Sequence, residues 1–280
     1  MLLEHVIKQQ GIIMKNILNQ FFKQSGKKEF VRGNSVLRIL EEETFADYGE
    51  KLILDELRSV YIVIPKTGCT SAKKFFSNYY GWKEAFNVHD PLSEIYEHVV
   101  RDDLLQEKYG QYYIFTFVRN PFSRLYSAYK SKLRLGDGAV RDRSNKTPSG
   151  QTPNWIDGVP PRLYKMGIRK EHNFRQFTEI VCATPDSRSD PHVKSQYQFV
   201  VSNNGKLLID KFYRFENYQE DFMSLLGRLG INASPDQLPH ENKTQSKLDE
   251  YVQYYDQDMV DMVVKRYKED FNLFGYSTKL

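Results

Sequence analysis

Cysteine is scarce in this chain, and long hydrophobic runs are missing. Its 280 residues include two cysteines, Cys69 and Cys182, which are too few for a disulfide framework. No segment approaches the roughly 18 consecutive apolar residues that indicate a membrane-spanning helix. Residues 1–22 contain only brief apolar clusters interrupted by Lys and Gln, unlike a signal peptide. These absences argue against a disulfide-rich secreted domain and against an integral membrane protein.

The remaining composition suits one α/β domain of ordinary solubility. Hydrophobic residues make up 40% of the chain, aromatic residues 14% and charged residues 27%, which is enough for a sizeable core. The net charge of +4 is modest, but basic residues gather between positions 119 and 146. They are Arg119, Arg124, Lys130, Lys132, Arg134, Arg141, Arg143 and Lys146. This segment is either a solvated helix face and loop or a basic rim that attracts anionic ligands. Nucleic acid is disfavoured because no groove-reading or base-stacking motif accompanies the charge.

The most informative segment covers residues 60–71. The apolar run Val60–Ile64 ends at Pro65, and Lys66-Thr67-Gly68-Cys69-Thr70-Ser71 follows before a segment that resembles the start of a helix. In such a strand-loop-helix unit, backbone N–H groups, the positive end of the helix, a lysine and hydroxyl groups converge on a phosphate. The lysine precedes a single glycine, so the loop is neither a Walker A loop nor a dinucleotide turn. The alternative is an ordinary strand-to-helix turn with a surface lysine.

A second strand-loop-helix unit follows at residues 114–133. The buried-strand run Ile114–Val118 precedes Arg119, and Pro121 suits the first turn of a helix. Apolar residues at helical spacing predict that one face of this helix packs inward; they are Phe122, Leu125, Tyr126, Tyr129 and Leu133. Arg119 occupies the carboxyl end of the strand, where open α/β sheets bind ligands, and Ser127 comes about two helical turns later. A guanidinium and a hydroxyl are suited to a second phosphate.

Together these two units resemble the carbohydrate sulfotransferases. Residues 65–71 resemble the 5′-phosphosulfate loop of that family, and residues 118–129 resemble its 3′-phosphate motif. The similarity is to the Golgi chondroitin, dermatan and HNK-1-type enzymes, the heparan sulfate 2-O-sulfotransferases and their bacterial counterparts. Three later segments, 212–222, 238–244 and 267–276, also resemble parts of the family. The resemblance thus covers about residues 58–277.

The resemblance implies a P-loop-like three-layer α/β fold, in which helices flank a central, mainly parallel sheet. We expect a helical and irregular lead-in at residues 1–57 and a sulfotransferase domain at 58–280. Within that domain, a loop-rich insertion at about 136–200 is expected to bind the acceptor. Further expected elements are a helix at 174–181, a strand at 206–215 and a helix at 249–268.

The resemblance also implies the sulfuryl donor 3′-phosphoadenosine 5′-phosphosulfate (PAPS). Lys66 would stabilise the transferring group, while Arg119 and Ser127 would hold the 3′-phosphate. The amides of residues 67–71 would hold the 5′-phosphate, and the 238–244 loop would return to the donor. The expected binding residues are Pro65, Lys66, Thr67, Gly68, Cys69, Thr70, Ser71, Arg119, Ser127, Lys243 and Thr244. Cys69 is interpreted as a packing residue of the loop.

Sulfuryl transfer also needs a base for the acceptor hydroxyl, and histidine is well suited to that task. His98 is the first candidate, because the heparan sulfate 2-O-sulfotransferases carry a catalytic histidine at a similar separation from the arginine motif; the alternative is a surface or capping histidine. His192, in Asp190-Pro191-His192, resembles the Asp-x-His segment of the chondroitin-type enzymes and is the second candidate, as base or as organiser of the site. His89 is the third and is more typical of a turn. Histidines this dispersed predict no metal site.

The sequence therefore predicts a PAPS-dependent carbohydrate O-sulfotransferase acting on an acidic or extended glycan. Two alternatives stay open: a P-loop-type kinase acting on a small molecule or sugar, and a catalytically degenerate nucleotide-binding module. With no anchor in view, we expect a cytoplasmic, bacterial-type soluble enzyme, peripheral to the membrane at most, or the lumenal part of a trimmed Golgi enzyme.

Overall fold

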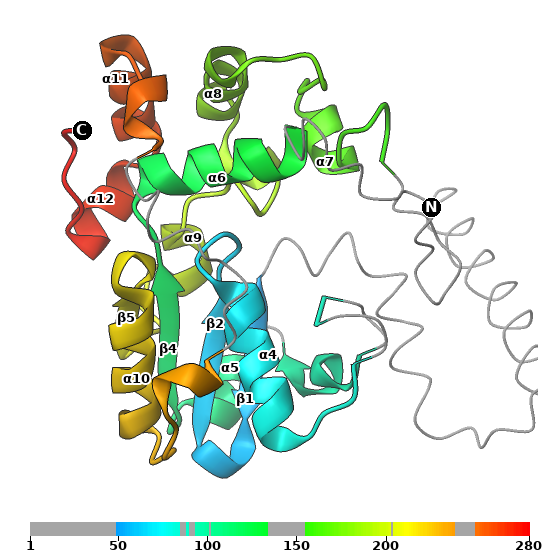
Figure 1. Cartoon of the computed structure of the whole chain (residues 1–280), viewed down its shortest axis with the longest axis vertical. Helices are drawn as coiled ribbons and strands as arrows, with labels where there is room; N and C mark the ends of the chain where they lie inside the picture. The colour runs from blue at the N-terminus through cyan, green and yellow to red at the C-terminus, as the bar shows by residue number, and fades with distance from the viewer. Residues whose placement is uncertain are drawn as a thin grey trace, which may run out of the picture. The chain divides into compact units, whose positions relative to one another are not determined.

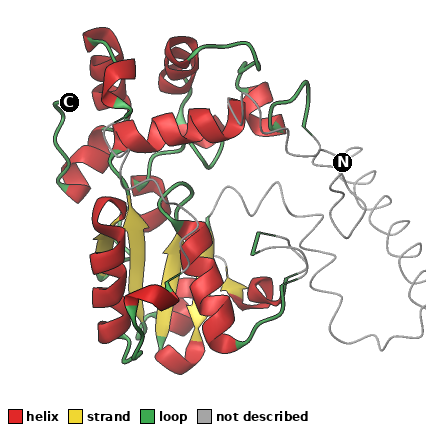
Figure 2. Cartoon of the chain, in the orientation of Figure 1, coloured by secondary structure: helices red, strands yellow, loops and turns green. Residues whose placement is uncertain are grey.

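The computed structural model describes residues 49–84, 88–89, 93–100, 102–133, 155–202, 204–238 and 250–280. Their centre is a five-stranded sheet in the order β3-β1-β2-β4-β5 (Figures 1 and 2). The strands are β1 (Glu50–Leu54), β2 (Ser59–Val63), β3 (Val99–Val100), β4 (Tyr113–Val118) and β5 (Lys211–Arg214). Strands β2, β4 and β5 run parallel, whereas β1 is antiparallel to both of its neighbours.

Helices cover both faces of this sheet (Figure 1). One face packs against α4 (Cys69–Tyr80) and α10 (Tyr218–Arg228), whose Phe76 and Phe222 contact the buried aromatic residues of the strands. The other face packs against α5 (Asp102–Tyr109), α9 (Tyr197–Val200) and α12 (Lys268–Phe274). Burial on both sides explains why β2 and β4 are nearly continuous apolar runs.

A separate helical layer lies beyond the carboxyl ends of β2 and β4 (Figure 1). It contains α6 (Pro121–Leu133), α7 (Pro161–Lys165), α8 (Phe174–Ala183) and α11 (Gln257–Arg266), which share one hydrophobic cluster. Short 3₁₀ helices complete the described chain: η1 (Asp55–Leu57), η2 (Glu94–His98), η3 (Asp186–Arg188), η4 (Phe215–Asn217), η5 (Pro235–Gln237) and η7 (Val252–Tyr254).

The α/β class and the two strand-loop-helix units are confirmed, with three differences in the surrounding elements. The sheet begins before residue 58, because β1 pairs with β2 from Glu50 onward. The C-terminal part of the expected loop-rich insertion contains α7, α8 and α9 and contributes to the core. The expected helix at 249–268 is interrupted, since Asp256 accepts from the Met259 amide at 3.0 Å and caps a new helix, α11.

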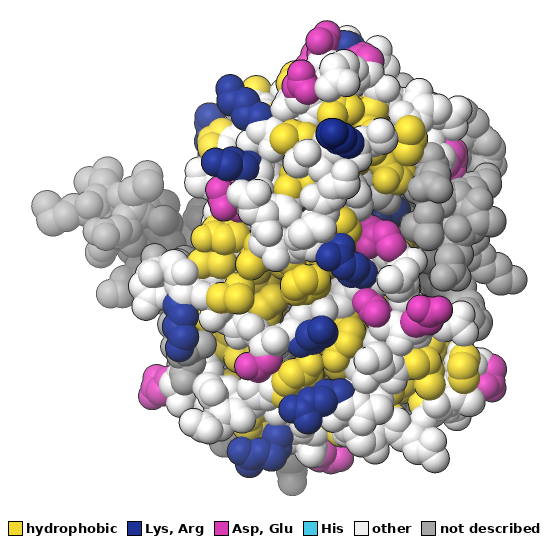
Figure 3. All heavy atoms as spheres, turned by 90° about the vertical axis from the view of Figure 1, so that its left-hand side faces the viewer, with side chains coloured by type: hydrophobic (Ala, Val, Ile, Leu, Met, Phe, Trp, Pro, Cys, Tyr) yellow, Lys and Arg dark blue, Asp and Glu magenta, His cyan; other side chains and the backbone are white. Residues whose placement is uncertain are grey.

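The surface beside α12 and α10 carries basic side chains scattered among hydrophobic ones (Figure 3). They do not form one continuous basic area on this face. Much of the basic segment 119–146 falls outside the described residues. Within the described ranges, none of the helices combines the length and apolar character needed to cross a membrane.

Candidate active site

The two motif loops lie side by side because their strands are neighbours in the sheet. Parallel pairing aligns Ile62 of β2 with Thr116 of β4, so both chains leave the sheet at the same edge. Nη1 of Arg119 donates to the Lys66 carbonyl at 3.3 Å and joins the two loops. The structure therefore brings together the lysine and the arginine that the sequence singled out.

The first loop leaves the N-terminus of α4 open to an anion. The first intrahelical bond runs from the Ala72 amide to the Gly68 carbonyl at 3.1 Å. The amides of Cys69, Thr70 and Ser71 precede it and have no acceptor four residues earlier in the helix. A helix N-terminus with such amides favours negative charge. This geometry is the one that the loop sequence predicts.

Gly68 is required by two features of this loop. Its φ of +86° lies in the left-handed region, which glycine adopts at little cost. A Cβ at this position would lie 2.5 Å from Cε2 of Tyr218, whose hydroxyl donates to the Gly68 carbonyl at 3.2 Å. Lys66 also has a positive φ, +73°, and such backbone strain in a non-glycine residue is typical of functional loops.

The loop hydroxyls have different partners. Thr67 is fully buried and donates to the Ile64 carbonyl at 2.8 Å, so it holds the loop together. Thr70 Oγ1 lies 2.9 Å from Nε2 of His89. Ser71 is 3% exposed. Thr67 thus stabilises the loop from inside. Thr70 lies at the start of α4, and its hydroxyl is paired with a histidine.

The Lys66 ammonium has no hydrogen-bond or ion-pair partner among the described residues. Burial, and then the positive charges of Lys132, Arg119 and Arg124, lower the pKa of Lys66 to about 8. An ammonium without a carboxylate partner and with a depressed pKa is suited to stabilising developing negative charge.

Arg119 is held by its neighbours in a way that leaves one nitrogen for a ligand. Nε donates to Ser123 Oγ at 2.8 Å, and the guanidinium lies 4.3 Å from the ring centre of Phe215. Nη2 has no partner within the described part of the chain. Burial lowers the pKa of Arg119 to about 10, so the group stays charged at neutral pH.

Ser123 is a contact that the sequence reasoning missed. The sequence predicted that Ser127 holds the 3′-phosphate together with Arg119, and Ser127 is half-buried in α6 one helical turn beyond Ser123. Ser123 and Ser127 are four residues apart and share a helix face. This spacing could have indicated that Ser123 also faces Arg119. The role of Ser127 in holding a phosphate stays a prediction.

Gln196 fixes the backbone of Arg119 and was also missed. Its Oε1 accepts from the Arg119 amide at 2.9 Å, and its Nε2 donates to the Arg119 carbonyl at 2.8 Å. Gln196 is fully buried, and its own amide donates to Asp270 at 2.9 Å. Asn120, which follows Arg119, donates its backbone amide to Glu216 at 2.7 Å. No sequence signal linked these distant residues to the motif.

His192 forms a dyad with Asp190. Oδ1 of Asp190 lies 2.7 Å from Nδ1 of His192 and accepts the His192 amide at 2.9 Å. Burial and the positive charges of Lys132 and Lys66 lower the pKa of His192, outweighing Asp190, which raises it. Arg124 donates both to the Pro65 carbonyl at 2.9 Å and to the Pro191 carbonyl at 3.1 Å, so the segment that carries the dyad is joined to the first loop.

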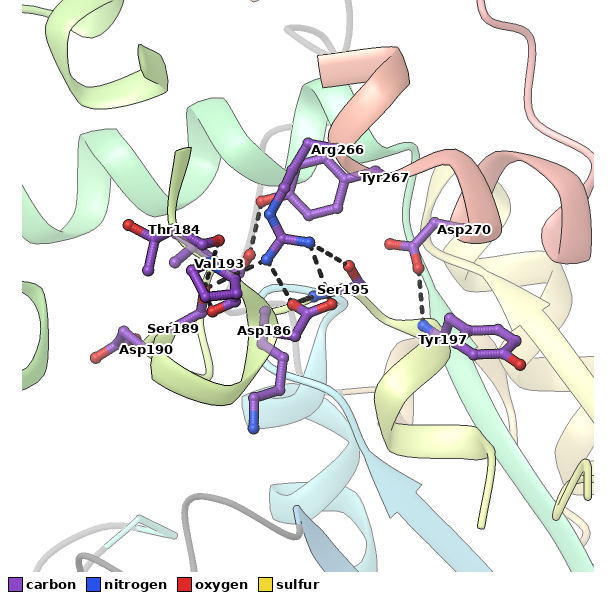
Figure 4. A network of polar contacts seen from close by, with 12 residues as sticks. Thr184, Asp186, Ser189, Asp190, Val193, Ser195, Tyr197, Arg266, Tyr267 and Asp270 are labelled. Carbon is purple, nitrogen blue, oxygen red and sulfur yellow. Dashed lines mark hydrogen bonds and ion pairs between the residues drawn. The ribbon is translucent and has the colours of Figure 1, made fainter. Parts of the chain in front are cut away.

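A polar network anchors the segment that carries this dyad (Figure 4). Arg266 pairs with Asp186 at 2.5 Å and donates to Ser195 Oγ at 2.9 Å. The Tyr267 hydroxyl donates to the Val193 carbonyl at 2.6 Å. Asp270 accepts from the Tyr197 amide at 2.8 Å. Contacts on both sides of His192 thus tie residues 186–197 to the C-terminal helices.

His89, the third histidine, lies closer to the loop than its sequence context indicates. A buried charged group lies near this histidine. In it, Lys73 pairs with Glu50, and the Tyr96 hydroxyl donates to Glu50 at 3.0 Å. Burial, and then the charge of Lys73, lower the pKa of His89 to about 4. His89 is therefore neutral near pH 7 and held against the helix start.

His98 lies at the opposite end of α4. Its ring stacks on Trp82, with 4.2 Å between ring centres, and Trp82 directly follows Gly81, which caps the C-terminus of α4. A helix of 12 residues is about 18 Å long. The structure does not bring His98 to Lys66, whereas it brings His192 and His89 to the loop.

Lys243 and Thr244 lie outside the described residues, so their contact with the donor stays a prediction. Within the described ranges, no group of three or more His, Cys, Asp or Glu side chains is arranged to hold a metal ion.

Comparison with known proteins agrees with this geometry. The sulfotransferase family profile matches residues 51–277. Carbohydrate sulfotransferase 14 of Danio rerio is 23% identical over 240 residues, which correspond to 80% of this chain and 61% of that protein. No solved structure matches the chain significantly. Because the profile spans both motif loops and the dyad, the chain belongs to the sulfotransferase family.

Proposed function

We propose that this protein transfers the sulfuryl group of PAPS to a hydroxyl group of a carbohydrate. The observation that carries the proposal is the contact between Arg119 Nη1 and the Lys66 carbonyl. It places an arginine suited to one phosphate beside a helix N-terminus suited to another, as a bisphosphorylated donor requires.

The residues present fit such a donor. The open amides of Cys69, Thr70 and Ser71 would hold the 5′-phosphosulfate. Nη2 of Arg119 would bind the 3′-phosphate. When bound, PAPS would supply an activated sulfuryl group, which would pass to the acceptor hydroxyl oxygen as the S–O bond to adenosine 3′,5′-bisphosphate breaks.

The dyad supplies the base. An ionised Asp190 accepts a hydrogen bond from the protonated Nδ1 of His192, and Nε2 of His192 then keeps a free electron pair. His192 would remove the proton of the acceptor hydroxyl, and Asp190 would hold the ring and stabilise the imidazolium that forms. Lys66 would stabilise negative charge that develops on the departing side. We assign the base to His192 rather than to His98 because Arg124 joins the residue before His192 to the residue before Lys66, whereas His98 lies at the other end of α4.

The acceptor class rests on similarity and charge. The related Danio rerio protein is named a carbohydrate sulfotransferase, and the basic segment that begins at Arg119 includes Lys132 in the last turn of α6. A basic segment that begins at the site suits an acidic or extended glycan, since it would attract a carboxylate or sulfate of the sugar chain.

Donor specificity can be tested by calorimetry with adenosine 3′,5′-bisphosphate and with ATP. We expect the bisphosphate to bind and Arg119→Ala to weaken its binding at least about tenfold, a loss of about 1.4 kcal/mol. Binding of ATP with no binding of the bisphosphate would contradict the proposal and favour the kinase alternative. Binding of the bisphosphate without any sulfuryl transfer would favour a degenerate binding module.

A further inference from the structure

Arg124 is a buried cation with an unusual set of partners. It is 2% exposed in the first turns of α6. Its three guanidinium nitrogens all donate to backbone carbonyls: Nε to Pro65 at 2.9 Å, Nη1 to Lys194 at 2.7 Å and Nη2 to Pro191 at 3.1 Å. Within the described residues, no carboxylate pairs with it. Burying a guanidinium in this way is costly, which indicates that its geometry has a function.

Two of these carbonyls belong to the peptide units that lead directly into the reacting side chains. Pro65 precedes Lys66, and Pro191 precedes His192. A peptide unit is planar, so a bond to the carbonyl of one residue restrains the amide of the next. One guanidinium is thus bonded to the peptide unit before the lysine and to the peptide unit before the histidine.

Arginine is suited to this task in a way that lysine is not. Its donors project from a rigid, planar fork, so carbonyls bonded to Nε and Nη2 are held at a fixed separation. A lysine ammonium is a compact charge on a flexible stem and imposes no such spacing. Sequence position alone does not reveal this role, because residues 65, 124 and 191 are far apart in the chain.

We propose that Arg124 is a positioning residue that sets the spacing between the Lys66 ammonium and the His192 imidazole. The inference rests on the proposed function, because that spacing matters only if both groups act on one transfer. Arg124 is not among the residues that are expected to contact the donor. Its loss therefore reduces turnover far more than donor affinity.

The test compares Arg124→Lys with the wild type and with a control, Arg175→Lys, on the exposed surface of α8. We expect Arg124→Lys to reduce kcat by about 100-fold, in the range that misplaced catalytic groups show. The Kd for adenosine 3′,5′-bisphosphate should change less than about threefold, and Arg175→Lys should leave both values unchanged. Unchanged kcat in Arg124→Lys, or an equal loss of kcat and of donor affinity, would overturn the proposal.

A double-mutant cycle separates positioning from a general structural role. If Arg124 acts through His192, Arg124→Lys should cost less than about threefold in kcat when His192 is already Ala. Additive losses would overturn the inference. If the lysine variant does not fold, Arg124→Gln, which keeps a planar donor without the charge, is measured by the same criteria. Absence of transfer by the wild-type protein would instead contradict the proposed function, so the two failures are distinguishable.

Discussion

Asp190 contacts His192 twice, once at Nδ1 of the ring at 2.7 Å and once at the backbone amide at 2.9 Å. The double contact fixes both the turn and the ring, so Nδ1 carries the proton and Nε2 is left to act as a base. We expect Asp190→Asn to reduce kcat by about 10²-fold or more, because the amide can donate to Nδ1 and favour the other tautomer. Initial transfer rates at saturating donor measure this. An unchanged kcat would exclude the dyad from the reaction.

The pH dependence of kcat/KM should be bell-shaped. His192 must be neutral to accept a proton, and its pKa is lowered by burial and by Lys132 and Lys66. The acidic limb should therefore lie below the ordinary histidine value of about 6.5. Lys66 must be charged, and its pKa is lowered to about 8, so activity should fall as the pH rises above about 8.

The alkaline limb can be assigned with Lys66→Arg. Because a guanidinium stays charged to much higher pH, whatever activity this variant retains should persist above pH 8. A limb that stays in place in Lys66→Arg would show that another group produces it.

Gly68 and Gly81 give a matched pair at the two ends of α4. Both have positive φ. A Cβ added to Gly68 would lie 2.5 Å from Tyr218, whereas a Cβ added to Gly81 would have no atom within 4 Å among the described residues. We expect Gly81→Ala to lower the free energy of unfolding by about 1 kcal/mol, from the backbone alone. Gly68→Ala should lower it by about 2–4 kcal/mol, since overpacking is added. Urea unfolding measures both. Equal effects would contradict the close contact with Tyr218.

His98 and His192 should respond oppositely to substitution. His98→Ala removes a ring stacked on Trp82 and should cost about 1 kcal/mol of stability while leaving kcat within about threefold of wild type. His192→Ala should lower kcat by about 10²–10⁴-fold. The reverse pattern would return the role of base to His98.

The sequence was sufficient for those features of the site that are local. The apolar run Val60–Ile64, the small residues after it and Pro121 each act within a few positions, so both strand-loop-helix units were predictable. Their adjacency followed from the rule that parallel strands end at one edge of a sheet. His192 was identified through an Asp-x-His pattern whose two members are also in contact in the structure.

The other contacts of the site depend on tertiary packing, and no local sequence pattern predicts them. The contacts of Gln196 with Arg119 span 77 residues, and those of Arg124 with Pro191 and Pro65 span 67 and 59 residues. Nothing near Gln196 distinguishes it from an ordinary surface glutamine. The place of His98 at the C-terminal end of α4 could not be predicted for the same reason, because separation along the chain does not specify which end of α4 a residue reaches.

The central claim is that Lys66 acts on a sulfuryl group in transfer to a sugar. The most direct measurement is transfer of radiolabelled sulfate from PAPS to a panel of neutral and acidic glycans. It compares the wild type with Lys66→Ala and with the control Lys268→Ala, which replaces an exposed lysine at the start of α12. We predict that the wild type and Lys268→Ala label at least one glycan equally and that Lys66→Ala labels it at least about 100-fold more slowly. Equal labelling by Lys66→Ala, or no labelling of any glycan by a wild-type protein that binds adenosine 3′,5′-bisphosphate, would contradict it.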